Sequence, residues 1–460
     1  MFLDDTIAAI ATPPGTGGIG IVRISGPRAL TILERTFRRG GGRMSSHRLY
    51  PGTLIDPEGG GVIDHVLAVV MYAPHSYTGE DVVEIHGHGG ALVMSRILSA
   101  VLAAGARHAE PGEFTRRAFL NGRIDLTQAE AVADIIHARS EGALRLAQRQ
   151  LAGELGRRLS AFHDRLLTLL ARTEAMIDFP EEDDVGEESE GIRRELPPLL
   201  SGMKRLLATF REGRILREGL SVAIVGRPNV GKSSLLNRLL RADRAIVTHI
   251  PGTTRDTLED YAMVGGVPLR LIDTAGLRPT EDFVEAAGME RTRETIEAAS
   301  LLLWVLDAAD PQPEAEAEIA RQIAGKRVIP ILNKIDRLPA GSGWEIPPPL
   351  RALPLSDPIF TSMTHGLGLE ELTARIVAVA FGGEVSPGEG VMISRERHRD
   401  ALRRAIAHLE NAYDAFEAQC SPEFAALDLS AALHALGEIT GTTTTEDLLD
   451  RIFSTFCIGK

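Results

Sequence analysis

Cysteine is nearly absent from this chain, since only Cys420 and Cys457 occur among its 460 residues. Two cysteines cannot build the disulfide framework of a small secreted domain, so the sequence predicts a reducing compartment, with the cytoplasm as the default. The N-terminal segment MFLDDTIAAIATPP has no basic residue before its apolar stretch and carries Asp4 and Asp5. It therefore predicts neither a secretory nor a mitochondrial leader.

Long apolar runs and an excess of positive charge are missing as well. The apolar region 91–105 is broken by Ser95, Arg96 and Ser99, whereas a membrane-spanning helix needs about 18 to 20 apolar residues in a row. We therefore expect a soluble protein without membrane attachment. The formal net charge of -13 and the lack of long basic runs argue against a general nucleic-acid binder, although they allow a local basic patch.

The pattern of apolar residues changes three times along the chain, which is long enough for about three domains. Residues 1–121 alternate short apolar runs with turn residues, with one helical stretch near 92–102, as in an α+β domain. Residues 122–218 have helical spacing, interrupted by an acidic loop. Residues 219–381 predict a mostly parallel sheet covered on both faces. Since residues 382–460 are again helical, the simplest architecture is a helical domain interrupted by an inserted α/β domain.

The segment GRPNVGKS, residues 226–233, fits the phosphate-loop pattern and lies between an apolar strand and a helical stretch. Its glycines let backbone amides turn toward phosphate oxygens, Lys232 adds a positive charge, and the Ser233 hydroxyl can ligate magnesium. A glycine-rich turn without a ligand is the alternative. The predicted nucleotide contacts are Asn229, Val230, Gly231, Lys232, Ser233 and Ser234.

Two further motifs indicate a guanine nucleotide. Asp273-Thr274-Ala275-Gly276 ends a strand, where Asp273 can hold magnesium through water and the Gly276 amide can sense the γ-phosphate. Asn333-Lys334-Ile335-Asp336 follows the strand RVIPIL, and the Asp336 carboxylate can accept hydrogen bonds from both the ring N–H and the amino group of guanine. Adenine offers no such pair of donors, so the three motifs in this order predict GTP with Mg²⁺.

The segment THIPGTTRD, residues 248–256, lies in the place of a switch loop that would bring Thr254 to the magnesium, or is an ordinary polar connection. Leu277 follows the second motif, where small signalling GTPases carry the glutamine that orients the attacking water. The candidates to replace that glutamine are Glu281, Asp282, Glu285 and Glu290. The predicted contacts in this segment are Thr248, His249, Ile250, Pro251, Gly252, Thr253 and Thr254.

The chain carries these motifs as GRPNVGKSS, PGTTRD, DTAGLR and NKID, and it ends in LGEITG…DLLDRIFSTFCIGK. Its N-terminal part contains ATPPGTGGIGIVRISG, YTGED, GHGG and PGEFTRRAFLNGRIDLTQAEA. Over essentially its whole length the chain resembles the MnmE (TrmE) family of tRNA-modification GTPases. The resemblance implies an N-terminal domain for folate binding and dimerisation, residues 1–121, and a Ras-like GTPase domain, residues 219–381, inserted between two halves of a helical domain, 122–218 and 382–460.

The resemblance also implies a reaction and a set of partners. The enzyme would work with the flavoprotein MnmG (GidA), which carries FAD, in a heterotetramer or larger complex. Together they would place an aminomethyl or carboxymethylaminomethyl group on carbon 5 of the wobble uridine, position 34, of certain tRNAs. The carbon would come from 5-formyl- or 5,10-methylene-tetrahydrofolate. The chain would be a homodimer whose GTPase domains pair when potassium and GTP are bound.

Site residues carry over to matching positions. Asn229 resembles the potassium-binding asparagine of the family, and Thr248, Ile250 and Thr253 fall where backbone oxygens complete that site. A potassium ion there would neutralise charge on the phosphates as an arginine finger does. Glu285 matches the catalytic glutamate. Magnesium would be held by Ser233 and Thr254.

The folate pocket of the family matches Arg23, Glu80 and Lys460, while Arg123 replaces its lysine and keeps the charge with another geometry. Without the resemblance, Arg23 and Glu80 read as ordinary surface residues. The resemblance further implies that the C-terminal segment reaches this pocket, with Cys457 as a reactive thiol or as a small apolar residue.

Several features leave alternatives. Cys457 also has the position of a prenylated cysteine, but the residues after it fit that signal poorly. His86 and His88 are expected to be loop residues rather than metal ligands. Ser362-Met363-Thr364 replaces the usual Ser-Ala-Lys near the base, where a backbone amide can still contact guanine.

A regulatory or ribosome-assembly switch GTPase is the second functional hypothesis, because the central domain alone would permit it. Such a switch would need neither a folate-like domain nor the FCIGK ending. The acidic balance further predicts that much of the tRNA grip lies on the partner.

Overall fold

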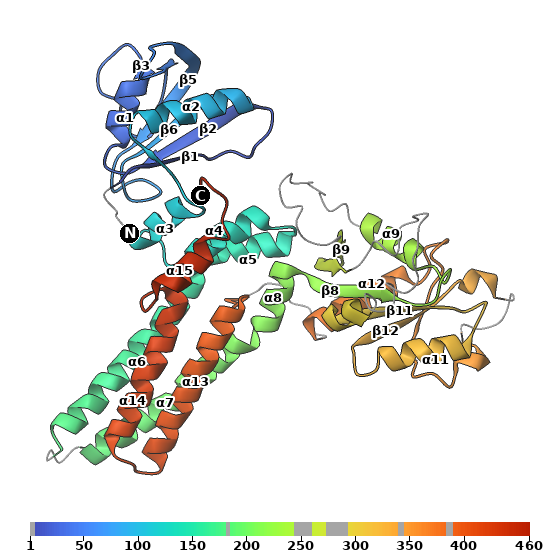
Figure 1. The fold of residues 1–460 in the computed structure, drawn as a ribbon. Coiled ribbons are helices and arrows are strands. Elements are labelled where there is room, and N and C mark those ends of the chain that lie inside the picture. The colour runs from blue at the N-terminus through green and yellow to red at the C-terminus, as the bar shows by residue number, and fades with distance from the viewer. Residues whose placement is uncertain (1–4, 181–184, 243–259, 273–292, 339–344, 383–389) are drawn as a thin grey trace. The chain divides into compact units, whose positions relative to one another are not determined.

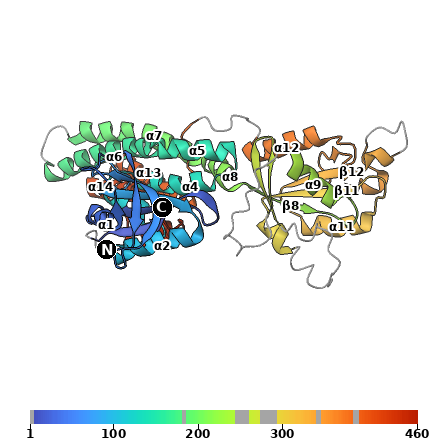
Figure 2. The ribbon, with the colours of Figure 1, turned by 90° about the horizontal axis from the view of Figure 1, so that it is seen from above.

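The computed structural model describes residues 5–180, 185–242, 260–272, 293–338, 345–382 and 390–460. The chain divides into two compact units, and the ribbon of each can be followed in Figures 1 and 2. The first unit comprises residues 1–133, 150–189 and 414–460, and the second comprises residues 134–149 and 190–413.

The first unit begins with a seven-stranded sheet in the order β3-β4-β5-β6-β2-β1-β7. Its strands are β1 (Ile7–Ile10), β2 (Gly17–Ser25), β3 (Phe37–Arg38), β4 (Leu49–Ile55), β5 (Val62–Met71), β6 (Val82–Gly89) and β7 (Arg107–His108). Helices α1 (Ala29–Thr36) and α2 (Ala91–Ala103) pack on one face through a shared apolar core (Figure 1). Side chains alternate between the two faces of a strand, so Val22 and Ile24 are buried in this core while Arg23 lies on the other face.

Two helices were not expected in this part of the chain. The sequence predicted one helix near residues 92–102, which is α2, but α1 and α3 (Glu113–Leu120) are also present. The prediction missed α3 because three of its buried residues are charged, namely Glu113, Arg116 and Arg117. Ion pairs with other elements, rather than an apolar stripe, keep them inside.

The remaining helices of the first unit bring distant parts of the chain together. Helices α6 (Glu154–Asp178) and α14 (Pro422–Thr440) pack side by side (Figures 1 and 2). A small core joins α4 (Leu126–His137) to α15 (Glu446–Phe453), with Leu126, Leu449 and Phe453 buried in it. The two helical segments that flank the inserted domain therefore meet, as the sequence predicted.

Four more helices continue the helical part: α5 (Glu141–Leu151), α7 (Val185–Ala208), α8 (Phe210–Glu218) and α13 (Glu396–Glu417). An ion pair of 2.6 Å between Lys204 and Glu410 links α7 to α13. The acidic stretch 180–191 was expected to be a loop, but α7 already begins at Val185. Glu187 and Glu188 lie in its first turn, where the helix dipole favours carboxylates.

The second unit contains a six-stranded sheet in the order β13-β12-β11-β8-β10-β9, parallel except for β9. Its strands are β8 (Leu220–Val225), β9 (Asp260–Val264), β10 (Val267–Leu271), β11 (Leu301–Asp307), β12 (Val328–Asn333) and β13 (Ile359–Phe360). The helices of this α/β domain include α9 (Lys232–Ala242), α11 (Pro313–Gln322) and α12 (Leu369–Phe381), with short 3₁₀ turns η2 (Ile335–Arg337) and η3 (Pro348–Leu350).

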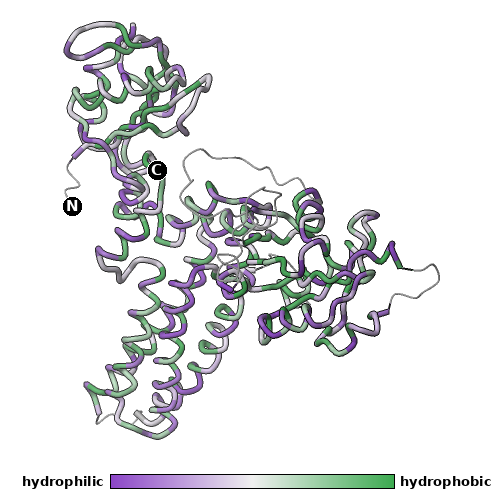
Figure 3. Tube along the Cα trace, turned by 45° about the vertical axis from the view of Figure 1, so that its right-hand side comes forward, coloured by the Kyte–Doolittle hydropathy of each residue, from purple (hydrophilic) through white to green (hydrophobic). Residues whose placement is uncertain are grey.

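Apolar cores cover both faces of this sheet. One core holds residues of α9 and α12, and the other holds residues of α11. The sheet of the second unit is mainly green in the hydropathy view, whereas the long helices alternate between green and purple (Figure 3). This confirms the predicted α/β domain, which interrupts the helical domain. Within the described ranges, no helix is both long and apolar enough to cross a lipid bilayer.

Candidate functional site

The nucleotide motifs follow parallel strands of the second sheet. The phosphate-loop segment follows β8, the Asn333-to-Asp336 motif follows β12, and residues 361–364 follow β13. The carboxyl ends of parallel strands meet at one edge of a sheet, which is where α/β folds bind ligands. The fold therefore brings these three predicted segments to one edge.

The phosphate loop is held against β11 and β12 at positions that only glycine can occupy. Gly226 has φ +144°, and a Cβ atom there would lie 2.2 Å from the carbonyl oxygen of Val305. At Gly231, with φ +108°, a Cβ atom would lie 2.2 Å from Nδ2 of Asn333. Helix α9 begins at the next residue, Lys232, so the loop amides lie at a helix N-terminus, the geometry that binds phosphate.

Lys232 turns back over the loop. Its Nζ donates to the carbonyl oxygens of Gly226, at 2.6 Å, and of Arg227, at 2.7 Å. Burial lowers the pKa of the Lys232 ammonium; the Glu316 carboxylate opposes this shift and the Arg227 guanidinium adds to it. The positive charge is thus surrounded by loop carbonyls beside the amides that would hold phosphate. Two other residues of the phosphate loop, Asn229 with φ +64° and Ser233, are exposed.

Asn333 joins the phosphate loop to the base-recognition loops. Its buried side chain donates through Nδ2 to the carbonyl oxygen of Val230 at 2.8 Å. Its Oδ1 accepts the Met363 amide at 3.2 Å and the Thr361 hydroxyl at 3.3 Å. The Asn333 side chain therefore links the phosphate loop, the loop after β12 and the loop after β13.

The rest of the base-recognition loops is held by polar contacts. Lys334, with φ +64°, pairs through Nζ with Asp307 at the end of β11. A hydrogen bond from Ser362 lowers the pKa of the Asp336 carboxyl, which therefore remains an ionised acceptor at neutral pH. The Thr364 carbonyl accepts a hydrogen bond from Arg238 at 3.1 Å.

The following predicted site residues lie outside the described residues: Thr248, His249, Ile250, Pro251, Gly252, Thr253, Thr254, Asp273, Thr274, Ala275, Gly276 and Glu285. Other residues were missed by the sequence reasoning although they support the site, above all Asp307 and Arg227. Arg227 lies inside the phosphate-loop pattern, but that pattern leaves its position free, so nothing in the sequence singled it out.

A second group of predicted residues meets on the outer face of the N-terminal sheet. Arg23 of β2 pairs through Nε with Oε1 of Glu84 at 2.9 Å, and it donates through Nη1 to the Gly459 carbonyl at 3.2 Å. Its guanidinium carbon lies 5.6 Å from the ring centre of Tyr77 and 5.7 Å from that of Phe114. Glu84 and the two rings were not predicted, because they carry no motif.

The C-terminal segment is fixed in this site. Ile458 forms an isolated β-bridge with Pro111, and the Cys457 carbonyl accepts the Gly112 amide at 3.4 Å. Burial and the charge of Arg23 lower the pKa of the Lys460 ammonium, while Glu84 and Cys457 oppose that shift. Arg23 and Lys460, far apart in the sequence, therefore share one electrostatic environment. The side chain of Cys457 is exposed.

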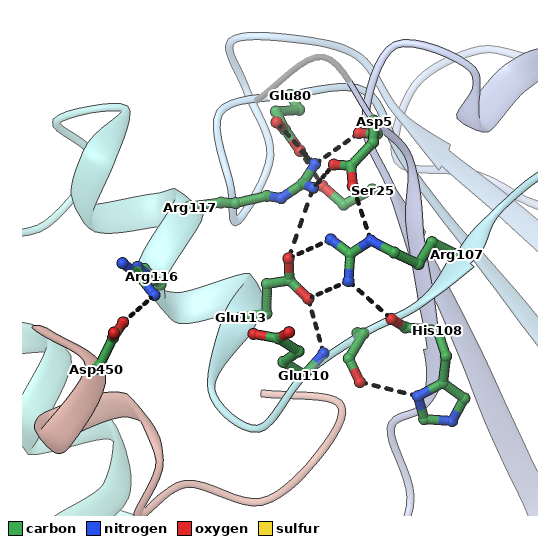
Figure 4. A network of polar contacts seen from close by, with 11 residues as sticks. Asp5, Ser25, Glu80, Arg107, His108, Glu110, Glu113, Arg116, Arg117 and Asp450 are labelled. Atoms are coloured by element: carbon green, nitrogen blue, oxygen red, sulfur yellow. Dashed lines mark hydrogen bonds and ion pairs between the residues drawn. The ribbon is translucent and has the colours of Figure 1, made fainter. Parts of the chain in front are cut away.

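Glu80 is held in a neighbouring network, which Figure 4 shows from close by. Its carboxylate accepts two contacts from Nη1 of Arg117, at 3.1 and 3.2 Å, and one from the Ser25 hydroxyl at 2.6 Å. Ser25 lies two residues after Arg23, on the same face of β2. Arg123 is exposed and lies beside Gly79, where an added Cβ atom would be 3.2 Å from Cγ of Arg123.

The paired histidines are in a strand, which corrects the expectation of a loop. His86 and His88 belong to β6. His86 lies 3.4 Å from Glu84, and His88 pairs through Nδ1 with Asp64 at 2.8 Å. In the part of the chain that the structure describes, no group of three or more His, Cys, Asp or Glu residues is arranged to hold a metal ion.

Comparisons with known proteins cover nearly the whole chain. The family model described as MnmE helical domain matches residues 126–457, and the one described as GTP-binding protein TrmE N-terminus matches residues 6–123. The tRNA modification GTPase MnmE of Heliobacterium modesticaldum is 50% identical over 99% of both chains, and that of Moorella thermoacetica is 50% identical over 100% of both. That of Geobacter sulfurreducens is 49% identical, again over 100% of both chains. The chain therefore belongs to the MnmE (TrmE) family.

Proposed function

We propose that this chain is a GTP hydrolase that acts in the modification of tRNA. The observation that carries the proposal is the position of Asn333, which ties the Val230 carbonyl of the phosphate loop to the Met363 amide near the base-recognising Asp336. Phosphates would bind the loop amides and Lys232, and guanine would bind Asp336. The relatives named above are all tRNA modification GTPases, which supports the same activity here.

The residues around the loop suit two cations. Ser233 and Thr254 would hold magnesium, which supplies charge neutralisation at the β- and γ-phosphates. Asn229 is exposed at the loop surface and would bind potassium together with backbone oxygens of Thr248, Ile250 and Thr253. The chain's own contribution is to hold the phosphates with fixed amides and Lys232, while Glu285 positions water for the attack.

The N-terminal site suits a reduced folate. Arg23 and Lys460 supply positive charge for the carboxylates of the ligand, and Tyr77 and Phe114 offer aromatic faces beside Arg23. We infer that 5-formyl- or 5,10-methylene-tetrahydrofolate binds here, with Glu80 and Arg123 at its border. The contact of Arg23 with Gly459 supports a role of the C-terminal ending in this site, whereas a pure switch GTPase would not need that ending.

The proposed reaction requires partners. The chain would act in the cytoplasm as a homodimer joined through its N-terminal domains, together with MnmG and its FAD. The pair would modify carbon 5 of the wobble uridine of tRNA, with the carbon supplied by the folate. Cys457, exposed next to this site, would be available there as a thiol.

GTP turnover in potassium and in sodium at equal ionic strength tests the hydrolase and its activating ion. We expect strong stimulation by potassium that Asn229→Ala abolishes, because the variant removes the side-chain oxygen offered to the ion. GDP affinity, measured by calorimetry, should be little changed in the variant. Equal slow turnover in both salts would contradict activation by potassium, and no turnover in either salt would contradict the hydrolase.

A further inference from the structure

A buried carboxylate stands behind the phosphate loop. Glu316 lies on α11, and its side chain is only 1% exposed. Burying an ionised carboxylate is costly unless it is paired and hydrogen-bonded. A stability argument alone does not explain its presence, because an apolar group of similar size is often at least as stabilising in such a place.

Both oxygens of Glu316 have a partner. Oε1 accepts Nε of Arg227 at 2.6 Å, and Oε2 accepts the indole N–H of Trp304 at 3.2 Å. Trp304 belongs to β11 and is 1% exposed, so its donor needs an acceptor inside the protein. The carboxylate thus joins α11, β11 and the phosphate loop.

Arg227 links Glu316 to Lys232 of the phosphate loop. Its guanidinium is held by Glu316 and also donates through Nη2 to the Asp310 carbonyl at 2.8 Å. Its own carbonyl oxygen accepts Nζ of Lys232 at 2.7 Å. The side chain of Arg227 is therefore held by Glu316 and by the Asp310 carbonyl, while its backbone carbonyl holds Lys232.

We propose that Glu316 is a positioning residue for nucleotide binding, which fixes the first turn of the phosphate loop through Arg227. The inference deepens the proposed function and rests on it, because it concerns the same guanine-nucleotide site. Glu316 does not reach the phosphates itself. It acts by keeping the carbonyls and amides of the loop in the geometry that Lys232 and the phosphates require.

Calorimetric titration of the full chain with GDP tests this role. Glu316→Gln keeps the size of the side chain and an acceptor for Trp304 but removes the charge that holds Arg227. We expect its GDP affinity to fall about tenfold or more, as for a lost hydrogen bond between charged groups. Glu318→Gln is the matched control, since Glu318 lies on the same helix with an exposed side chain paired to Arg321.

A double-mutant cycle with Arg227→Gln separates the pair from independent effects. If the two residues act as a unit, the double variant should bind GDP no more weakly than the weaker single variant. The double variant leaves no charge buried without a partner, so it carries the test if Glu316→Gln does not fold. The KM for GTP should rise, while kcat at saturating GTP changes little, because no group that meets the reacting phosphate has been altered.

Fluorescence of Trp304 distinguishes a positioning role of Glu316 from a role in fold stability alone. In a Trp344→Phe background Trp304 is the single tryptophan, and GDP should change its emission because the loop and the indole share one carboxylate. Arg227→Gln should abolish that change. Wild-type GDP affinity in the double variant, additive losses, or an unaltered fluorescence response in Arg227→Gln would overturn the inference. Failure of the unmodified chain to bind GDP would instead overturn the proposed function.

Discussion

The nitrogen and the oxygen of the buried Asn333 side chain form hydrogen bonds with two different loops. The nitrogen holds the phosphate loop through Val230, and the oxygen holds the base-recognition loop through Met363. Arg23 plays a similar part in the N-terminal site, where it contacts both Glu84 and Gly459. In both sites a single side chain brings together segments that are far apart in the sequence.

Asp5 should make the stability of the N-terminal domain depend on pH. Its burial opposes the shift, but bonds from Arg107 and Arg117 outweigh it and lower the pKa of the carboxyl below 3.8 (Figure 4). A depressed pKa in the folded state stabilises the protein above the unfolded value, and this stabilisation is lost as the pH falls through the folded value. Because the side chain is 35% exposed, solvent screens the pair, and we expect Asp5→Asn to lower the free energy of unfolding by only about 1 kcal/mol at pH 7.

Urea denaturation at pH 7 and at pH values below 3.8 measures this effect. The difference between Asp5→Asn and the unmodified chain should narrow in acid. Glu34→Gln, at an exposed carboxyl of α1, serves as the control and should change little at either pH. A constant difference across this range would show that the charge of Asp5 is not responsible.

Glu285 should be needed for hydrolysis but not for binding. Leu277 cannot orient the attacking water, and a carboxylate can polarise or position it. We therefore expect Glu285→Ala to bind GTP and GDP normally while losing turnover by at least about 100-fold, as for the loss of a general base. Calorimetry and single-turnover kinetics check this, with Glu290→Ala as the comparison. Unchanged turnover in Glu285→Ala would remove the assignment.

Short motifs single out the candidate nucleotide residues, but they do not predict the contacts among them. Asn333 was named as a base-recognition residue, yet its link to Val230 depends on how β12 and the phosphate loop lie at the same sheet edge. Glu80 was named for folate, but its engagement with Arg117 and Ser25 depends on the burial of α3. Such long-range pairs leave no local pattern in the sequence.

Among the helices and strands, apolar periodicity predicted those that are stabilised mainly by apolar packing. The buried strands β8, β11 and β12 were visible as apolar runs before polar motifs, because parallel strands are covered on both faces. Helix α3 was missed, since Glu113 and Arg117 are buried in ion pairs rather than in an apolar stripe. The acidic start of α7 was also misread, because its carboxylates favour a helix N-terminus rather than a loop.

The C-terminal segment is fixed by backbone geometry that can be tested at Gly459. This residue has φ +94°, and a Cβ atom there would lie 2.4 Å from the carbonyl oxygen of Ile10. Gly459→Ala should therefore displace the segment, remove the Arg23 contact and weaken binding of 5-formyltetrahydrofolate. The strain of a left-handed backbone alone is of order 1–3 kcal/mol.

Gly60→Ala is a matched control for that experiment. Gly60 has φ +69°, and a Cβ atom there would meet no other atom within 4 Å, so the variant carries the backbone strain without the collision. Limited proteolysis of the C-terminal segment and calorimetry with 5-formyltetrahydrofolate compare the two variants. Equal folate affinity in Gly459→Ala and Gly60→Ala would contradict the role of the docked segment.

Within the first unit, the beginning and the end of the chain are brought together. Because α6 packs on α14 and α4 on α15, the last residues of the chain reach the sheet formed by the first. The insertion was predicted from the return of helical spacing after residue 382. That the C-terminal segment reaches the N-terminal site was implied only by the resemblance, and its contacts with Pro111 and Ile10 were not predicted, since no periodicity connects positions so far apart.

If GTP hydrolysis by this chain serves tRNA modification, a change of base specificity should change which nucleotide supports that modification. Asp336→Asn should lose GTP and gain XTP, because asparagine can donate a hydrogen bond to the additional carbonyl of xanthine. The measurement is nucleoside analysis by mass spectrometry of tRNA incubated with MnmG, folate and either form of the chain. We expect the unmodified chain to modify the wobble uridine with GTP and not with a non-hydrolysable analogue, and Asp336→Asn to do so only with XTP. Modification that proceeds equally without a hydrolysable nucleotide would contradict that role of GTP hydrolysis.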